Sequence, residues 1–275
     1  RSDLIESFLK KNKEFSSKSI AVQYLVDENI SKGNIKEACK KIEFIDATVE
    51  DPYLEKFKIY CLVFNNKKNE AQLLYDILRE QKKSDNFFDD KINFLLGITN
   101  KTSNKINEKN LLNFYLSSIT IKNFNFEPTK NTKKIIWDYL NAANLIQLDD
   151  IEDKEKIKSL EFAANEGQLD KTKIFDIYKK IPFELNALIN AENIYLTLNS
   201  IDSRALIYQK YLLSDREESK VKFLFFLEEL FKKDDLKNVY IKFLSDRLKE
   251  IDPEKIPESY QELVKNNIIS DDDYK

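Results

Sequence analysis

The sequence lacks histidine and methionine altogether, and its 275 residues include two cysteines, three glycines and five prolines. Without histidine there is no Ser-His-Asp or Cys-His catalytic group, no histidine zinc ligand and no side chain that ordinarily titrates near neutral pH. Two cysteines are too few for a four-cysteine metal site or for an iron–sulfur cluster. We therefore predict no metal site and no cofactor, and we expect the protein not to be an enzyme.

The scarcity of glycine limits both the nucleotide-binding motifs and the fold classes that the sequence can form. Gly33, Gly97 and Gly167 stand far apart, whereas the dinucleotide fingerprint and the phosphate loop both need glycines clustered in one turn. So few glycines leave little room for tight β-hairpins, and long stretches rich in Lys, Glu, Leu and Ile favour helices. The composition predicts an all-α fold.

The charges are balanced, with 45 basic and 48 acidic side chains interleaved and a formal net charge of -3. Nucleic-acid binding needs a basic face that neutralises phosphates, so we predict no nucleic-acid partner. The densest apolar run, FLFFL at 223–227, is far shorter than the roughly 20 residues that span a bilayer. We predict no transmembrane segment in this chain. Because it starts at Arg1 and contains no Met, we expect it to be a fragment or a processed chain.

Apolar residues recur at helical spacing in successive pairs of segments separated by short polar turns. Tyr178, Tyr208 and Tyr240 lie in the second segments of three pairs, at spacings of 30 and 32 residues. Two helices per unit at this period are typical of an α-solenoid, here a tetratricopeptide-like superhelix of stacked helix pairs. An ordinary helical bundle is the alternative. The predicted pairs are 18–31 with 34–46, 52–65 with 68–82, 155–166 with 170–181, 184–198 with 203–213, and 217–232 with 235–250.

The middle of the chain follows this pattern less closely. Residues 97–110 are polar and indicate a loop or linker, while 111–121 and 132–147 are predicted as helices. We predict two helical arrays, over residues 1–100 and 101–275, with one continuous array as the alternative. The three repeated tyrosines are expected to pack in the core between repeats rather than to line a groove.

The two cysteines lie in the first two predicted pairs. SKGNIKEACKKIEFI at 31–45 and FNNKKNEAQLLYDIL at 64–78 share a polar turn, Glu-Ala and apolar residues at helical spacing. Cys39 lies on the second helix of the first pair and Cys61 on the first helix of the next, and such helices are neighbours in a stack. Two interpretations stay open at this point: a disulfide, and two buried free thiols that behave as small hydrophobes.

Three segments, at 51–81, 166–183 and 202–212, resemble segments of a group of exported helical proteins of alphaproteobacteria whose activity is undetermined. In that group one cysteine precedes the acidic-Pro-aromatic turn and another lies in the following apolar helix, and Cys39 and Cys61 occupy these positions. The resemblance implies export to the periplasm, where disulfides persist, and a Cys39–Cys61 bond. This chain has Lys, Asn, Ile and Phe at many positions where the group has Ala.

The favoured functional interpretation is a non-catalytic helical-repeat scaffold or adaptor that binds another protein or a peptide, in a bacterial cell envelope. The candidate contact residues, near repeat turns or on second helices, are Tyr60, Tyr75, Arg79 and Arg204. The alternative is a helical enzyme, or its accessory domain, acting on polysaccharide or peptidoglycan, with Glu161 in LEFAANEG as general acid. A third interpretation is a dimerising structural domain.

Overall fold

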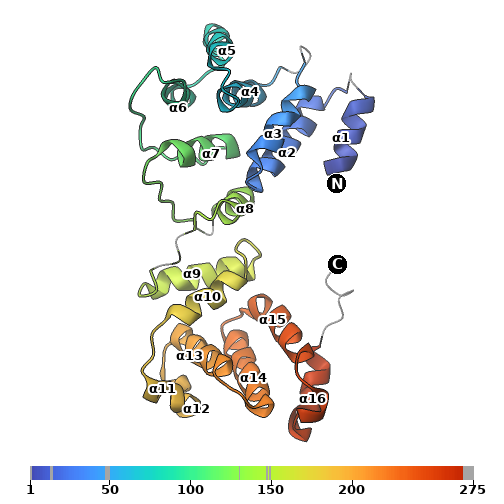
Figure 1. The fold of residues 1–275 in the computed structure, drawn as a ribbon, viewed down its shortest axis with the longest axis vertical. Helices are drawn as coiled ribbons and strands as arrows, with labels where there is room; N and C mark the ends of the chain where they lie inside the picture. The colour runs from blue at the N-terminus through green and yellow to red at the C-terminus, as the bar shows by residue number, and fades with distance from the viewer. Residues whose placement is uncertain are drawn as a thin grey trace. The chain divides into compact units, whose positions relative to one another are not determined.

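The computed structural model describes residues 2–12, 15–46, 50–129, 131–146, 148 and 150–268. Throughout these residues the regular structure is helical and no strand occurs, which confirms the all-α prediction. The chain divides into two compact units, which we call the first unit (residues 1–146) and the second unit (residues 147–275) (Figure 1). The division therefore lies near residue 146 and not near residue 100, where we predicted the change from one array to the next.

The first unit contains the first two predicted helix pairs. Each predicted helix of these pairs is present, although the second helix of the first pair tightens to a 3-10 turn and ends early. Two further helices, α1 and α6, were not predicted. The elements of the unit are α1 (Ser2–Lys11), α2 (Lys18–Ser31), α3 (Ile35–Lys40), η1 (Lys41–Phe44), α4 (Pro52–Phe64), α5 (Lys68–Glu80), α6 (Asn86–Leu96), α7 (Leu111–Thr120) and α8 (Lys134–Ala142).

Local signals place the ends of these helices. The Asp51 side chain accepts hydrogen bonds from the backbone N–H groups of Tyr53 and Leu54, and Pro52 occupies the first turn of α4, where a missing N–H is harmless. Gly97 ends α6 in the left-handed conformation, with a φ of 83°. Caps of this kind explain why the predicted start of α4 matches the observed one.

Helix α2 is the centre of the first unit. It packs against α3, and also against α7 and α8 from the far end of the unit. In a solenoid each repeat contacts only its neighbours, so these contacts describe a closed bundle, the alternative to the predicted stack. Gly33 follows α2 with a φ of 72°, and a Cβ atom added to it would lie 3.8 Å from the Cβ atom of Ala142 at the end of α8.

The polar segment 97–110 belongs to the first unit and does not act as a linker. The buried amine of Lys91 on α6 donates to the carbonyl oxygen of Ser103. The neighbouring Asp90 carboxylate accepts hydrogen bonds from the hydroxyl groups of Thr102 and Ser103. These bonds hold the segment against α6, and α6 itself packs on α7. The predicted boundary is wrong here because a loop that is fixed by side-chain hydrogen bonds also needs a polar sequence, as a linker does.

The second unit contains the other three predicted pairs. Helix 184–198 was predicted as continuous but is broken at Asn190, whose side chain donates to the carbonyl and amide oxygens of Asn186. The elements are α9 (Lys154–Asn165), α10 (Thr172–Lys180), α11 (Leu185–Ile189), α12 (Ala191–Ile194), η2 (Tyr195–Thr197), α13 (Ser200–Leu212), α14 (Glu217–Lys233), α15 (Lys237–Lys249), η3 (Pro253–Lys255) and α16 (Glu258–Asn267).

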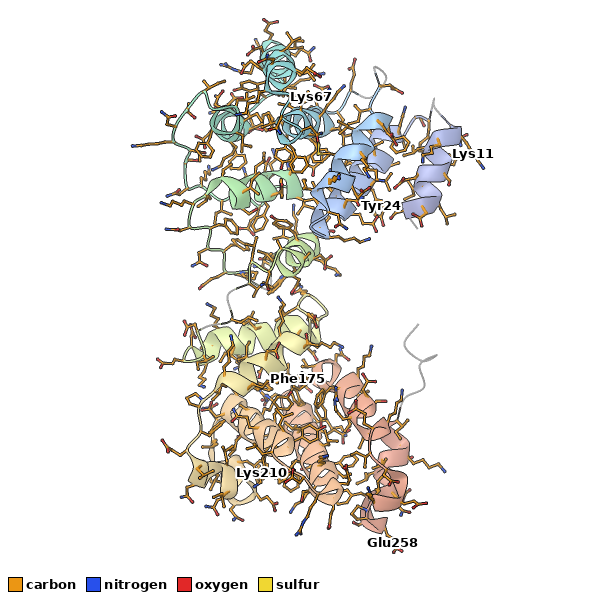
Figure 2. All side chains as sticks on the ribbon, in the orientation of Figure 1. Lys11, Tyr24, Lys67, Phe175, Lys210 and Glu258 are labelled. Atoms are coloured by element: carbon orange, nitrogen blue, oxygen red, sulfur yellow. A yellow bond between two sulfur atoms is a disulfide. The ribbon has the colours of Figure 1, made fainter. Side chains whose placement is uncertain are left out.

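Aromatic rings form the core of the second unit. Tyr178, Tyr208 and Tyr240 are all buried, as predicted. Phe175, labelled in Figure 2, packs beside two of them, with its ring centroid 6.2 Å from that of Tyr178 and 5.1 Å from that of Tyr208, and it stacks on Phe243 at 4.3 Å. Around this core α10 packs on α13, α13 on α14 and α14 on α15, while α15 also contacts α9. The second unit is therefore also closed.

A disulfide joins Cys39 on α3 to Cys61 on α4, with a Cα–Cα distance of 5.5 Å. Both cysteines are buried, and Cys61 is completely inaccessible. The bond that the resemblance implied is thus present, and it connects the first two helix pairs as their predicted adjacency requires.

We expect replacement of both cysteines by serine, Cys39→Ser with Cys61→Ser, to lower the free energy of unfolding of the first unit by about 3 kcal/mol. The reason is that the bond closes a loop of 22 residues in the unfolded chain. Urea unfolding followed by circular dichroism measures the change.

Reductant provides the control for this prediction. It should lower the unfolding midpoint of the unaltered protein toward that of the double variant, and it should leave the variant unchanged. Two reactive thiols in denatured, unreduced protein that was made under oxidising conditions would contradict the bond.

Candidate functional site

A cleft of about 480 Å³ opens in the second unit. Its walls come from three places: one side of α9, the first turn of α13, and the turn that joins α14 to α15. We call this feature the cleft. It is lined by Lys154, Glu155, Lys158, Glu161, Phe162, Asn199, Ser200, Ile201, Arg204, Asp234, Asp235 and Leu236.

The floor of the cleft is a group of charges around Arg204, a side chain that is 1% exposed. Its Nε and Nη2 atoms donate to the two carboxylate oxygens of Glu161, at 3.1 and 2.7 Å. Its Nη1 atom donates to Asp234, and the Tyr178 hydroxyl donates to Glu161. The guanidinium carbon also lies 5.4 Å from the ring centroid of Phe231. We call Glu161, Arg204 and Asp234 the ion triad.

Each member of the ion triad comes from a different element, and local packing explains its position. Glu161 lies on α9 between the buried side chains of Leu160 and Ala164, so it faces the core. Arg204 lies on the buried face of α13, while Asp234 ends α14. A fork of two parallel N–H···O bonds fixes orientation as well as distance. The triad thus ties α9, α13 and the end of α14 together at the cleft.

The charges in the ion triad stabilise one another. Burial alone would raise the pKa of Asp234, but the hydrogen bond and charge of Arg204 outweigh it and hold that pKa below its usual value. Burial would lower the pKa of Arg204, yet Tyr178, Glu161 and Asp234 together raise it. Burial, and then the Glu161 charge, raise the pKa of the Tyr178 hydroxyl well above 10.0. Arg204 is therefore a permanent cation and Tyr178 a permanent donor.

This arrangement does not suit Glu161 to the role of general acid. A general acid must carry a proton toward the reacting group. Both oxygens of Glu161 instead accept hydrogen bonds from a guanidinium, and one of them also accepts from Tyr178. Glu161 does lie at a cleft, as the enzymatic alternative required, but its carboxylate is committed to Arg204.

The rim of the cleft is more accessible than its floor. Phe162, the residue after Glu161, is 52% exposed. Lys154 pairs with Asp202 at 2.7 Å. Lys158, at the middle of the α9 wall, has no ion pair within the described part of the chain. Apolar, basic and acidic groups therefore meet within one cavity, which is the composition of a site that binds a ligand through several contacts.

The structure separates the four residues that were predicted to contact a partner. Tyr60 is buried, with its hydroxyl 2.6 Å from that of Tyr115. Tyr75 is also buried, on the inner stripe of α5, and Arg204 belongs to the ion triad in the other unit. Arg79 is the exposed member, with its guanidinium carbon 5.7 Å from the ring centroid of Tyr75.

Tyr60, Tyr75 and Arg204 are therefore core residues, which corrects that prediction. The reason is that proximity to a turn does not decide which way a helical side chain points. Tyr75 shares a stripe with Ala71 and Leu78, and this spacing already indicated the core.

Phe162, Lys158 and Asp234 were not singled out from the sequence. One signal was available, because Lys154, Lys158 and Phe162 follow one another at intervals of four residues and therefore share a face of α9. An aromatic residue on an otherwise charged face is unusual for a solvent-exposed stripe. For Asp234 no comparable local signal exists, because only the packing of α14 on α13 brings it to Arg204.

A second polar pair, partly buried, lies in the first unit, where the Tyr53 hydroxyl on α4 donates to the Asp27 carboxylate on α2. Burial raises the pKa of Asp27 from 3.8 to about 6, although hydrogen bonds from Tyr53 and Gln23 act in the opposite direction. Asp27 therefore changes charge in a pH range where a chain without histidine has few other titrating groups.

Within the described residues no group of three or more His, Cys, Asp or Glu side chains is arranged to hold a metal ion. In the same part of the chain, every helix is too short or too polar to cross a membrane.

We expect Arg204→Met to lower the free energy of unfolding of the second unit by about 3–5 kcal/mol, because it leaves Glu161 buried without its partner. Urea unfolding followed by far-ultraviolet circular dichroism measures the loss in free energy of unfolding. The matched control is Arg247→Met, which removes an exposed ion pair with Glu250 and should cost less than about 1 kcal/mol. Equal losses in the two variants would contradict a stabilising ion triad.

Asp27 predicts a pH dependence of stability. Its folded-state pKa is raised, so its contribution to stability is complete below pH 3.8 and is lost as the pH rises through about 6. Between pH 5 and pH 7 we expect the free energy of unfolding of the unaltered protein to fall by about 1 kcal/mol through Asp27. The Asp27→Asn variant should lack this decrease. Urea unfolding at both pH values measures this difference. The control is Asp138→Asn, at a half-exposed position on α8, which should show the same pH dependence of stability as the unaltered protein. If Asp27→Asn also keeps that pH dependence, Asp27 is not its source.

Comparisons with protein-family models, with curated proteins and with solved structures found no match for this chain. The alphaproteobacterial resemblance therefore remains an expectation from the sequence. The functional assignment rests on the geometry of the cleft and of the residues that form it.

Proposed function

We propose that this protein is a non-catalytic helical module that binds a segment of another protein, and that the cleft of the second unit is its binding site. The observation that carries the proposal is the position of a half-exposed phenylalanine, Phe162, beside a cavity whose floor is held by the ion triad. Exposed aromatic residues beside rigid pockets are the usual anchors of protein recognition.

The rigidity of the cleft favours binding. Its three walls are joined by the hydrogen bonds of Arg204 and by buried apolar contacts, so they lose little conformational freedom when a ligand binds. A cavity of about 480 Å³ has room for a few side chains of a bound segment and not for a folded domain. This size suits a loop or an extended peptide of the partner.

The disulfide supports the wider setting of the proposal. The buried Cys39–Cys61 bond is of the kind that persists in oxidising compartments. We propose the periplasm of a bacterial cell envelope as the location of this adaptor.

The alternative, an enzyme or accessory domain acting on polysaccharide or peptidoglycan, has less support. It requires a carboxylic acid that can protonate a leaving group and a second carboxylate across the cleft. Glu161 is buried and Asp234 is exposed, and both carboxylates are bound to the same guanidinium. Their geometry favours an architectural role.

Selection of peptides from a random library displayed on phage tests the proposal directly, with the purified 275-residue chain as the target. We expect enriched peptides that bind the unaltered protein at least about tenfold more tightly than they bind Phe162→Glu, because a charge at this position opposes an apolar anchor. Fluorescence polarisation with the labelled peptides measures the dissociation constants.

Leu263→Glu is the matched control, since Leu263 is similarly exposed on α16 but does not line the cleft. It should bind the enriched peptides as the unaltered protein does. Enrichment of no peptide, or equal loss of binding in the two variants, would overturn the cleft as the binding site.

A further inference from the structure

Resting on the proposed function, we infer that the segment bound by the cleft presents a basic side chain, arginine above all, next to an apolar residue. The inference draws on two properties of the cleft walls: their charge and the exposed ring of Phe162. Each points to a feature of the ligand.

The charge of the walls is acidic. Four carboxylates line the cleft, those of Glu155, Glu161, Asp234 and Asp235, against the three cations Lys154, Lys158 and Arg204. One of these cations, Lys154, is already paired with Asp202, which lies just outside the lining. The excess of negative charge around the cavity therefore favours a cationic ligand over an anionic one.

The carboxylates at the rim are the ones that a ligand can reach. Asp235 lies in the exposed turn before α15, with a φ of 56°, and Glu155 is exposed in the first turn of α9. Neither has an ion-pair partner among the residues that the structure describes. Glu161 and Asp234, by contrast, are held by Arg204. Asp235 and Glu155 are thus the groups available to a guanidinium or an ammonium.

Phe162 distinguishes arginine from lysine. A guanidinium is planar and weakly hydrated, so it stacks on an aromatic ring while its N–H groups bind a carboxylate at the edge. The ring of Phe162 and the carboxylates of Asp235 and Glu155 line the same cavity, which allows both contacts at once. The nearby side chains of Ile201 and Leu236 form an apolar wall for the neighbouring residue of the segment.

The peptides enriched on the unaltered protein serve as the probes for this inference. We expect them to share an arginine or lysine beside an apolar residue, and we expect replacement of that basic residue by glutamate to weaken binding at least about tenfold. Polarisation titrations at low and at physiological salt measure the constants, and binding should weaken as salt increases.

Variants of the protein assign the contact to the acidic rim. Asp235→Asn combined with Glu155→Gln removes both charges while asparagine keeps the left-handed backbone that position 235 adopts. We expect this double variant to bind the probes about tenfold more weakly, and Lys158→Glu to bind them at least as tightly as the unaltered protein. Glu262→Gln, exposed on α16 outside the cleft, is the control for loss of a surface charge and should have no effect.

The outcomes separate the inference from the proposed function. The basic ligand is overturned, and the cleft remains a binding site, if the Phe162-dependent probes are acidic or uncharged. The same conclusion follows if Lys158→Glu abolishes probe binding and the double variant retains it. Absence of any Phe162-dependent probe overturns both. Circular dichroism spectra that match the unaltered protein establish that each variant is folded.

Discussion

The bidentate ion pair between Arg204 and Glu161 is the interaction on which the second unit depends. Apolar side chains tolerate several arrangements of the helices they join, whereas a guanidinium fork accepts a carboxylate in a narrow range of distance and angle. Through this fork, and through its further bond to Asp234, Arg204 specifies how α9, α13 and the end of α14 meet. The charges are tolerable in the interior because each is paired and hydrogen-bonded.

The same interaction shapes the candidate site. Because Glu161 and Asp234 are used within the protein, the floor of the cleft is rigid and offers little reactive chemistry, while the accessible groups remain at the rim. A rigid floor with a half-exposed ring above it is the basis of our proposal that the cleft binds a segment of another protein. In the first unit the Cys39–Cys61 bond has a comparable role, since it fixes the contact between the first two helix pairs.

Much of the local structure was predictable. The bounds of α2 match the predicted 18–31, and α4 begins at Pro52 as predicted, because apolar periodicity and capping residues act within a few positions of the chain. The site was predictable only in pieces. Glu161 and Arg204 were both singled out, but for unrelated roles and without any indication that they touch. Their separation of 43 residues leaves no local signal of contact.

By itself, the sequence determined that the chain is helical, where most helices begin, that the repeated tyrosines are core residues, and that histidine chemistry is absent. The tertiary structure alone decided that α2 packs on α8 and α9 on α15, that the units divide near residue 146, and that Tyr60, Tyr75 and Arg204 face inward. The physical reason is the separation in sequence between the residues that interact. Periodicity and capping depend on neighbouring residues, whereas closure of a bundle and burial of a charge depend on contacts between residues that are distant in sequence.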